Sequence, residues 1–241
     1  MSKIDLKNIS HSYNPNDPNP TYALNPFSMT WENGKRYAIL GPSGCGKTTM
    51  LNIVSGLVRP SAGNILFDDK DVTNLKTESR NIAQVFQFPV IYNTMTVYEN
   101  LAFPLKCRDF LKDKIEERVN SVADTLNLKS FLNSPARKLT ADQKQLISLG
   151  RGLVREDVAA VLMDEPLTVI DPDLKFRLRR KLKEINEEFK TTLVYVTHDQ
   201  NEAMTFADNI IVMSEGEVVQ AGTPKELFER PNTTFVGYFI G

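Results

Sequence analysis

The fold of this chain is decided by one stretch of sequence, Gly41-Pro42-Ser43-Gly44-Cys45-Gly46-Lys47-Thr48. Its glycines allow backbone N–H groups to close around phosphate oxygens. The Lys47 side chain is long enough to reach the β and γ phosphates of a nucleotide, and the Thr48 hydroxyl is a suitable ligand for magnesium. The stretch therefore predicts a phosphate-binding loop.

The residues on either side fit such a loop. The apolar run at residues 37–40 predicts a strand that enters it, and residues 49–54, which start at Thr49, predict a helix that leaves it. A phosphate-binding loop requires this strand–loop–helix order, because the N-terminus of the helix faces the phosphates. The alternative, a glycine-rich turn with a chance lysine, does not explain the two flanking elements.

The composition limits the class of protein. The chain has 241 residues, of which 41% are hydrophobic and 24% charged, enough for one large globular domain or two small ones. Lys plus Arg total 29 against 30 for Asp plus Glu, and this net charge of −1 argues against a nucleic-acid partner. The first residues lack an apolar signal segment, and no apolar run approaches the roughly 18 residues that cross a bilayer. Cys45 and Cys107 fit neither a disulfide framework nor a zinc site, so we expect a soluble protein of the reducing cytoplasm.

The first third of the chain predicts a mixed sheet around the phosphate loop. Short strands are expected at residues 4–9, 27–31, 65–67 and 82–86. Residues 14–20 are rich in Asn, Asp and Pro, so we expect a surface loop there.

The periodicity changes between Thr96 and Arg155. Apolar residues recur there at helical spacing and predict an inserted helical block; they are Val97, Leu101, Leu105, Ile115, Val119, Val122 and Leu126. Residues 158–163 and 192–196 are continuous apolar runs, which are typical of parallel strands buried on both faces. A charged helix is expected between them. Its basic residues predict a solvated face, with membrane contact as the alternative; they are Lys175, Arg177, Arg179, Arg180, Lys181 and Lys183.

Two carboxylates follow the predicted strand at residues 158–163. Open α/β sheets bind ligands at the carboxyl ends of their strands, where Asp164 and Glu165 stand. Successive strand side chains point in opposite directions. Asp164 is therefore a candidate to hold magnesium through water, and Glu165 is a candidate base for a water beside the γ phosphate.

Two further polar residues stand at the ends of predicted strands. Gln87 follows the strand at 82–86, and His198 follows the strand at 192–196. The Gln87 amide is able to coordinate magnesium and the attacking water, and His198 is able to hydrogen-bond the γ phosphate and orient the base. Either residue alone is more typical of a surface position. The prediction that they belong to the site depends on the order in which they follow the phosphate loop along the chain.

The order of these motifs resembles that of the ATP-binding cassette (ABC) ATPases, and the resemblance covers nearly the whole chain. The motifs are the phosphate loop, Gln87, the helical block, Leu139-Thr140-Ala141-Asp142-Gln143, Asp164-Glu165, Asp171 and Val196-Thr197-His198-Asp199-Gln200. Three C-terminal segments are similar to the branch that imports maltose, glycerol phosphate and glycerol; they are Met213 to Pro224, Glu226 to Phe228 and Phe235 to Gly241.

The resemblance assigns further residues to the site. It implies that Tyr13 stacks on adenine, the alternative being a place in a core strand, and that Asp171 contacts an opposing cassette. It also implies that the apolar segment from Gln87 to Tyr92 faces a groove that docks a membrane subunit. The alternative is that this segment packs inside the helical block.

The segment Leu139–Gln143 departs from the Leu-Ser-Gly-Gly-Gln signature of the family, which meets ATP held by the other cassette. Ala141 and Asp142 replace the two glycines, so β carbons stand where the family brings backbone close to phosphate. At about 5 Å and an effective dielectric near 20, one like-charge pair costs roughly 3 kcal/mol before screening. For the isolated fold the change is favourable, because Thr140 and Gln143 predict a capping box and Asp142 lies at the positive end of the helix dipole. We therefore expect an asymmetric pair of two different cassettes.

For the fold, the resemblance implies an α/β P-loop NTPase (RecA-like) core with a mostly parallel sheet, an antiparallel β portion near the N-terminus and a helical subdomain. The core is expected at residues 1–87 and 158–241, and the helical subdomain at 88–157. The regulatory C-terminal β domain of many family members is absent from a chain that stops at Gly241, so we expect a shortened form.

For function, the resemblance implies a subunit that hydrolyses ATP with Mg²⁺ at the cytoplasmic face of the cell membrane. It would drive two transmembrane permease subunits that receive a small polyol or sugar, glycerol in the first place, from an extracytoplasmic binding protein. Two other classes remain open. A soluble cassette ATPase of DNA repair or translation would carry a long coiled-coil insertion or a second cassette, and this sequence has neither. A regulatory module with little hydrolysis is disfavoured by the intact Glu165 and His198.

Overall fold

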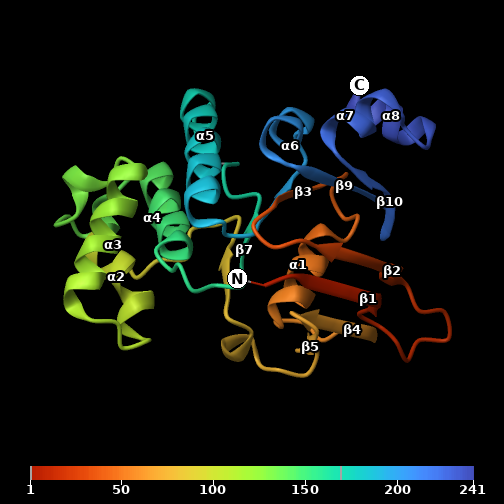
Figure 1. The fold of residues 1–241 in the computed structure, drawn as a ribbon, viewed down its shortest axis with the longest axis horizontal. Helices are drawn as coiled ribbons and strands as arrows, with labels where there is room; N and C mark the ends of the chain where they lie inside the picture. Colours follow the sequence, from red (N-terminus) through yellow and green to blue (C-terminus); the bar gives the residue numbers. More distant parts are fainter. Residues whose placement is uncertain (1, 169) are drawn as a thin grey trace.

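The strands of this computed structural model form two sheets (Figure 1). The structure describes residues 2–168 and 170–241. The larger sheet has six strands, in the spatial order β10 (Glu217–Gly222), β9 (Asn209–Ser214), β3 (Arg36–Leu40), β8 (Leu193–Thr197), β7 (Ala160–Asp164) and β6 (Ile82–Val85). Neighbouring strands are parallel except β10, which pairs antiparallel with β9. The predicted α/β class with a mostly parallel sheet is confirmed.

The central strands β7 and β8 are buried along their whole length. Continuous apolar runs suit such strands, because both faces of a parallel sheet are covered. Both strands end one residue later than predicted, so Asp164 is the last residue of β7. In contrast, β6 ends at Val85, and the prediction that Gln87 directly follows this strand is wrong by one residue.

The second sheet is antiparallel, as predicted for the N-terminal portion. Its strands lie in the order β2 (Tyr22–Trp31), β1 (Ile4–Ser12), β4 (Ala62–Phe67) and β5 (Lys70–Asp71), and a 3-10 turn follows at Thr77–Arg80. The strands β1 and β2 are longer than the predicted 4–9 and 27–31. His11 and Ser12 continue the pairing with β2 after irregularities in the register, and an apolar pattern does not reveal such a continuation. The predicted loop at residues 14–20 is confirmed.

The helix α1 (Lys47–Ser55) lies between the two sheets (Figure 1). Met50 and Leu51 of this helix pack in one apolar cluster with Ile4 of β1 and Leu162 of β7. Because α1 contacts both sheets, its N-terminus is fixed relative to the carboxyl ends of the parallel strands.

The predicted helical block is confirmed as three helices, α2 (Val97–Lys106), α3 (Lys112–Thr125) and α4 (Ala141–Leu153). Short 3-10 turns at Lys129–Phe131 and Ala136–Lys138 connect α3 to α4. All of the apolar residues that predicted the block are buried in one cluster, which also contains residues of β6 and β7. The division of the chain into a core and a helical subdomain stays a prediction.

The basic residues of α5 (Pro172–Phe189) do not all face solvent, so that prediction is partly wrong. Lys175 and Arg179 lie 3.8 and 3.3 Å from the carboxylate of the buried Glu202. Periodicity of charge does not reveal this partner, because Glu202 comes from a different helix, α6 (Gln200–Phe206).

The C-terminal helices α7 (Pro224–Glu229) and α8 (Thr234–Ile240) cover one end of the larger sheet. Leu227 and Val236 of these helices pack against Leu40 and Val212 of the sheet. Within residues 2–168 and 170–241, no helix combines the length and the apolar character that a bilayer span requires.

Candidate active site

The phosphate loop connects the end of β3 to the start of α1, as predicted. Gly46 caps α1 in a left-handed conformation, with φ of 101°, and a β carbon there would clash with the carbonyl of Ala23. Only glycine fits this position without strain. The strand–loop–helix order that the sequence predicts is therefore confirmed.

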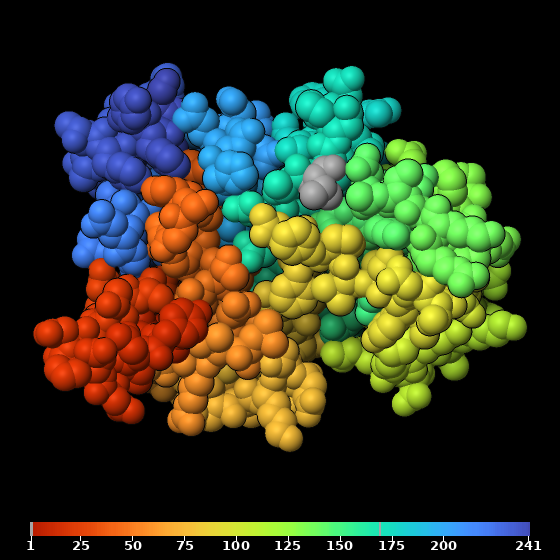
Figure 2. Space-filling model, turned by 180° about the vertical axis from the view of Figure 1, so that it is seen from behind, coloured from red at the N-terminus to blue at the C-terminus, as the bar shows by residue number. Residues whose placement is uncertain are grey.

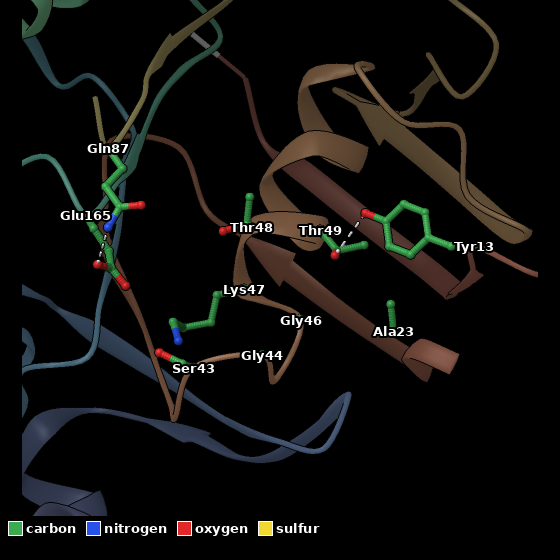
Figure 3. Close-up of a pocket in the computed structure, with 10 residues that line it drawn as sticks. All are labelled: Tyr13, Ala23, Ser43, Gly44, Gly46, Lys47, Thr48, Thr49, Gln87 and Glu165. Atoms are coloured by element: carbon green, nitrogen blue, oxygen red, sulfur yellow. Dashed lines mark hydrogen bonds between the residues drawn. The ribbon is translucent and has the colours of Figure 1, made fainter. Parts of the chain in front are cut away.

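A cavity of about 410 Å³ lies beside this loop. Figure 3 shows the residues that line it, which are Tyr13, Ala23, Ser43, Gly44, Gly46, Lys47, Thr48, Thr49, Gln87 and Glu165. All except Ala23 are residues that the sequence predicted. Tyr13 and Glu165 lie on opposite sides of the loop in this view, so the cavity has room for an extended ligand between them.

Tyr13 lies just after β1 and its side chain is 64% exposed, so the alternative that it belongs to a core strand is wrong. Its hydroxyl lies 3.2 Å from the hydroxyl of Thr49, and its ring is nearly perpendicular to that of His11, with 4.5 Å between the ring centroids. These two contacts hold the ring in place, and most of its surface stays exposed beside the cavity.

Lys47 is almost fully buried. Its ammonium donates to the carbonyls of Gly41 at 2.7 Å and Pro42 at 2.9 Å, so the charge is held at the loop. Figure 3 shows this amine turned toward Ser43. The neighbouring Cys45 is buried, and burial raises the pKa of its thiol, which keeps it uncharged.

Three oxygen groups stand near the loop where the sequence placed magnesium ligands. The first two are the Thr48 hydroxyl and the carboxylate of Asp164, which is 8% exposed. Burial raises the pKa of Asp164, the charge of Glu165 raises it further, and Thr48 and Lys47 oppose these effects. The third group is the Gln87 amide oxygen, and such hard oxygens are the donors that magnesium prefers.

Among the described residues, no three His, Cys, Asp or Glu side chains gather into a metal-binding cluster. This does not conflict with magnesium, which is usually held by one or two carboxylates together with phosphate and water. The donors present therefore fit a magnesium ion that arrives with a nucleotide.

The predicted base is brought together with its two predicted partners. Gln87 donates from Nε2 to Oε2 of Glu165 at 3.2 Å, and His198 Nδ1 lies 3.4 Å from Oε1 of the same carboxylate. Thr168, which the sequence did not single out, donates to Oε2 at 3.4 Å. Glu165 itself has a left-handed φ of 44° and donates its N–H to Val196 of β8 at 3.0 Å. A carboxylate fixed in this way beside the cavity is placed to accept a proton from a water.

The segment Leu139–Gln143 does not line the cavity. The Thr140 N–H donates to Oε1 of Gln143 at 3.0 Å, and the Gln143 N–H donates to the Thr140 hydroxyl at 3.4 Å. This confirms the predicted capping box, with Ala141 and Asp142 in the first turn of α4. Leu139 packs against the helical block.

Asp171 caps α5, where its carboxylate accepts from the N–H groups of Asp173 at 3.0 Å and Leu174 at 3.4 Å. Its contact with an opposing cassette stays a prediction, as does the contact of Leu139–Gln143 with a partner's nucleotide.

The apolar segment after β6 divides into exposed and packed residues. Phe88 and Val90 are 71% and 52% exposed, whereas Ile91 packs against the helical block. The alternative that the whole segment packs inside the block is therefore wrong. Figure 2 shows this segment in yellow on the surface, between the orange part of the chain and the green helices. Beside it lies a groove of about 270 Å³, where Arg151 donates to the Val90 carbonyl at 2.7 Å and lies over the Tyr92 ring.

Comparisons with known proteins agree with this geometry. The family model described as ABC transporter matches residues 24–168. The chain is 42% identical to the sn-glycerol-3-phosphate import ATP-binding protein UgpC 3 of Agrobacterium fabrum, over all of this chain and 67% of that protein. The chain thus spans about two thirds of the length of the curated relatives it matches.

Two solved structures share the fold. The first is cbiO1 from Clostridium perfringens, part of the ABC transporter complex cbiONQ, with a TM-score of 0.83 and 28% identity over 94% of this chain and 90% of that one. The second is the ATP-binding cassette MJ0796, a dimer in a post-hydrolysis state bound to ADP and Pi, with a TM-score of 0.82 and 28% identity over 92% of this chain and 98% of that one. Since the family model covers more than half of the chain, this chain belongs to the ABC transporter family, as one of its ATPase cassettes.

Proposed function

We propose that this chain hydrolyses ATP in the cavity between Tyr13 and Glu165, and that the reaction powers an importer. One observation carries the proposal: Glu165 is held by Gln87 and lies beside His198, facing the phosphate loop. A general base needs such orientation within reach of a substrate water.

Each part of the cavity has a chemical role in this proposal. Tyr13 stacks on adenine, and the loop Gly41–Thr48 with the Lys47 ammonium binds the phosphates. Thr48, Gln87 and Asp164 would hold magnesium, which neutralises charge on the phosphate oxygens when bound. Glu165 accepts a proton from the attacking water, and His198 orients this carboxylate and hydrogen-bonds the γ phosphate.

The relatives support a more specific substrate class. The Agrobacterium fabrum relative is named for sn-glycerol-3-phosphate import, and it is 42% identical to this chain. We therefore place sn-glycerol-3-phosphate ahead of glycerol as the imported molecule. No residue of this chain selects that molecule in our proposal, because it passes through the permease subunits.

The proposed assembly has two cassettes, two transmembrane permease subunits and an extracytoplasmic binding protein that acts indirectly, with this chain on the cytoplasmic face of the membrane. The MJ0796 cassette is a dimer, which supports pairing of cassettes. The altered segment Leu139–Gln143 supports a different second cassette, because Asp142 disfavours phosphate at one of the two sites.

The variant Glu165→Gln tests the proposal. In the complex isolated from native membranes through a tag on this chain, we expect ATP binding to persist and phosphate release to fall by about 100-fold or more. Glu229→Gln removes an exposed carboxylate on α7 and serves as the matched control. Normal hydrolysis by Glu165→Gln would exclude this residue as the base. Binding of ATP without phosphate release in the unmodified complex would favour a regulatory module instead.

A further inference from the structure

A buried amide on α4 connects the two backbone segments that carry Gln87 and Glu165. Gln145 is fully buried, and its Nε2 donates to the carbonyl of Phe86 at 3.2 Å and to the carbonyl of Pro166 at 2.9 Å. The sequence did not single out this residue.

Both carbonyls lie next to residues of the proposed active site. The Phe86 carbonyl belongs to the peptide bond that leads into Gln87, and Pro166 directly follows Glu165. The side chains of Gln87 and Glu165 hydrogen-bond each other at 3.2 Å. One amide group therefore fixes the two backbones whose side chains must meet.

Two further side chains on the same face of α4 bond the backbone of the segment that follows Gln87. Ser148 and Arg151 follow Gln145 at intervals of three residues, and they bond the N–H and the carbonyl of Val90 at 3.3 and 2.7 Å. Among the side-chain hydrogen bonds of the described residues, Gln145 is the one on α4 that reaches the segment after Glu165. Since α4 begins at Ala141, one rigid helix joins the altered segment Leu139–Gln143 to this contact.

We propose that Gln145 is a positioning residue, which sets the distance between Gln87 and Glu165 and thereby the rate of ATP hydrolysis. This inference rests on the proposed function. The residue acts through two backbone segments and does not line the cavity.

The unpaired end of the side chain supports a role beyond stability. Within the described residues, no donor reaches the buried Oε1 of Gln145, and an unsatisfied buried acceptor lowers stability. An apolar side chain of similar shape would remove this acceptor together with the two hydrogen bonds. It would also leave the carbonyls of Phe86 and Pro166 without this donor, so we expect Gln145→Met to lower the melting temperature by several degrees.

The test compares Gln145→Met with a matched control in the isolated complex, with MgATP as the substrate. Asn186 on α5 is also buried and also donates to two backbone carbonyls, those of Gly34 and Thr191. Gly34 and Thr191 precede the amino ends of β3 and β8, whereas the cavity lies at the carboxyl ends of the parallel strands. For Gln145→Met we expect kcat to fall about tenfold or more, because small displacements of a catalytic group are costly, with KM within about twofold. For Asn186→Leu we expect both to stay within about twofold.

Gln145→Asn keeps the amide on a shorter stem and should give an intermediate kcat; it also replaces Gln145→Met if that variant does not fold. Equal kcat values for Gln145→Met and Asn186→Leu would overturn the assignment, as would a raised KM with an unchanged kcat. If the proposed function itself is wrong, the result is a different one: Glu165→Gln then hydrolyses ATP normally. Loss of hydrolysis in Glu165→Gln with full activity in Gln145→Met would reject the role of Gln145 alone.

Discussion

At the scale of single residues, Lys47 places a buried positive charge inside the phosphate loop. Its ammonium bonds two carbonyls of its own loop, and a nucleotide offers phosphate oxygens at the same place. We expect Lys47→Ala to weaken ATP binding by about 10- to 100-fold, since hydrogen bonds to charged groups contribute about 1.5–3 kcal/mol. Calorimetric titration with MgATP measures this. Lys225→Ala, an exposed lysine on α7, should bind as the wild type does, and undiminished affinity in Lys47→Ala would remove the lysine from its assigned role.

Asp164 shows a conflict between stability and activity. Burial raises the pKa of this carboxyl above the usual value of 3.8, so its ionised form costs folding free energy at neutral pH. This cost is present above the folded-state pKa and disappears as the pH falls below the unfolded-state value. We expect Asp164→Asn to raise the melting temperature at pH 7, with a gain that shrinks toward pH 4.

The same substitution should weaken the dependence of ATP binding on magnesium, because it removes the one buried carboxylate among the proposed ligands. Thermal melts at the two pH values and MgATP titrations measure the two effects. A lower melting temperature at pH 7 would show that the contact with Thr48 outweighs burial.

Much of the site was predictable because its residues follow elements with strong patterns. Asp164 and His198 adjoin buried parallel strands, whose carboxyl ends meet at one edge of the sheet. Ala23, Thr168 and Gln145 were missed for a physical reason. Ala23 lines the cavity but has no functional group that a sequence pattern would reveal. Thr168 and Gln145 act through hydrogen bonds that depend on tertiary contacts rather than on residue type or spacing.

At the scale of elements, the residues in the first turn of α4 stabilise the start of their own helix. The capping box of Thr140 and Gln143 is present, and Asp142 stands beside the positive end of the dipole. We expect the double variant Ala141→Gly with Asp142→Gly to raise ATP turnover several-fold in the assembled complex, because it removes a like charge and two β carbons from the partner's phosphates.

The same double variant should lose about 1–2 kcal/mol of stability, since glycine is a poor helix former. Steady-state phosphate release and a thermal melt measure the two effects. Asp113→Gly, in the first turn of α3, provides the control for the helix effect alone. Turnover that is unchanged or lower, despite a folded complex, would contradict the electrostatic account of the signature.

Elements with one dominant pattern were predicted best. The helices α2 and α3 have a clear apolar stripe, and β7 and β8 are buried throughout, with apolar runs up to their last residue. The ends of β1 and β2 were not predicted, because pairing there continues through His11 and Ser12 after irregular register. The ion pairs of Glu202 with α5 were also missed, since the partners lie on different helices.

At the scale of the whole molecule, the proposed nucleotide cavity and the proposed docking segment lie on different parts of the fold. The cavity lies beside α1, and the exposed Phe88 and Val90 lie on the segment that follows β6. Gln87 is shared, because it lines the cavity and begins this segment. A partner that displaced this segment would therefore move Gln87, which hydrogen-bonds Glu165 directly.

This arrangement predicts that attachment to the membrane complex can be lost without loss of nucleotide binding. We expect Phe88→Ser with Val90→Ser to reduce recovery of the chain with its permease subunits by at least about tenfold, because apolar side chains desolvated at the centre of an interface contribute most of its affinity. Affinity for MgATP should stay within about twofold, since neither side chain lines the cavity. Tyr238→Ser removes an aromatic that is 91% exposed on α8 and should leave recovery unchanged. If Tyr238→Ser detaches the chain and the double variant does not, the permease docks at the C-terminal helices instead, and Gln87 loses its proposed place between the two surfaces.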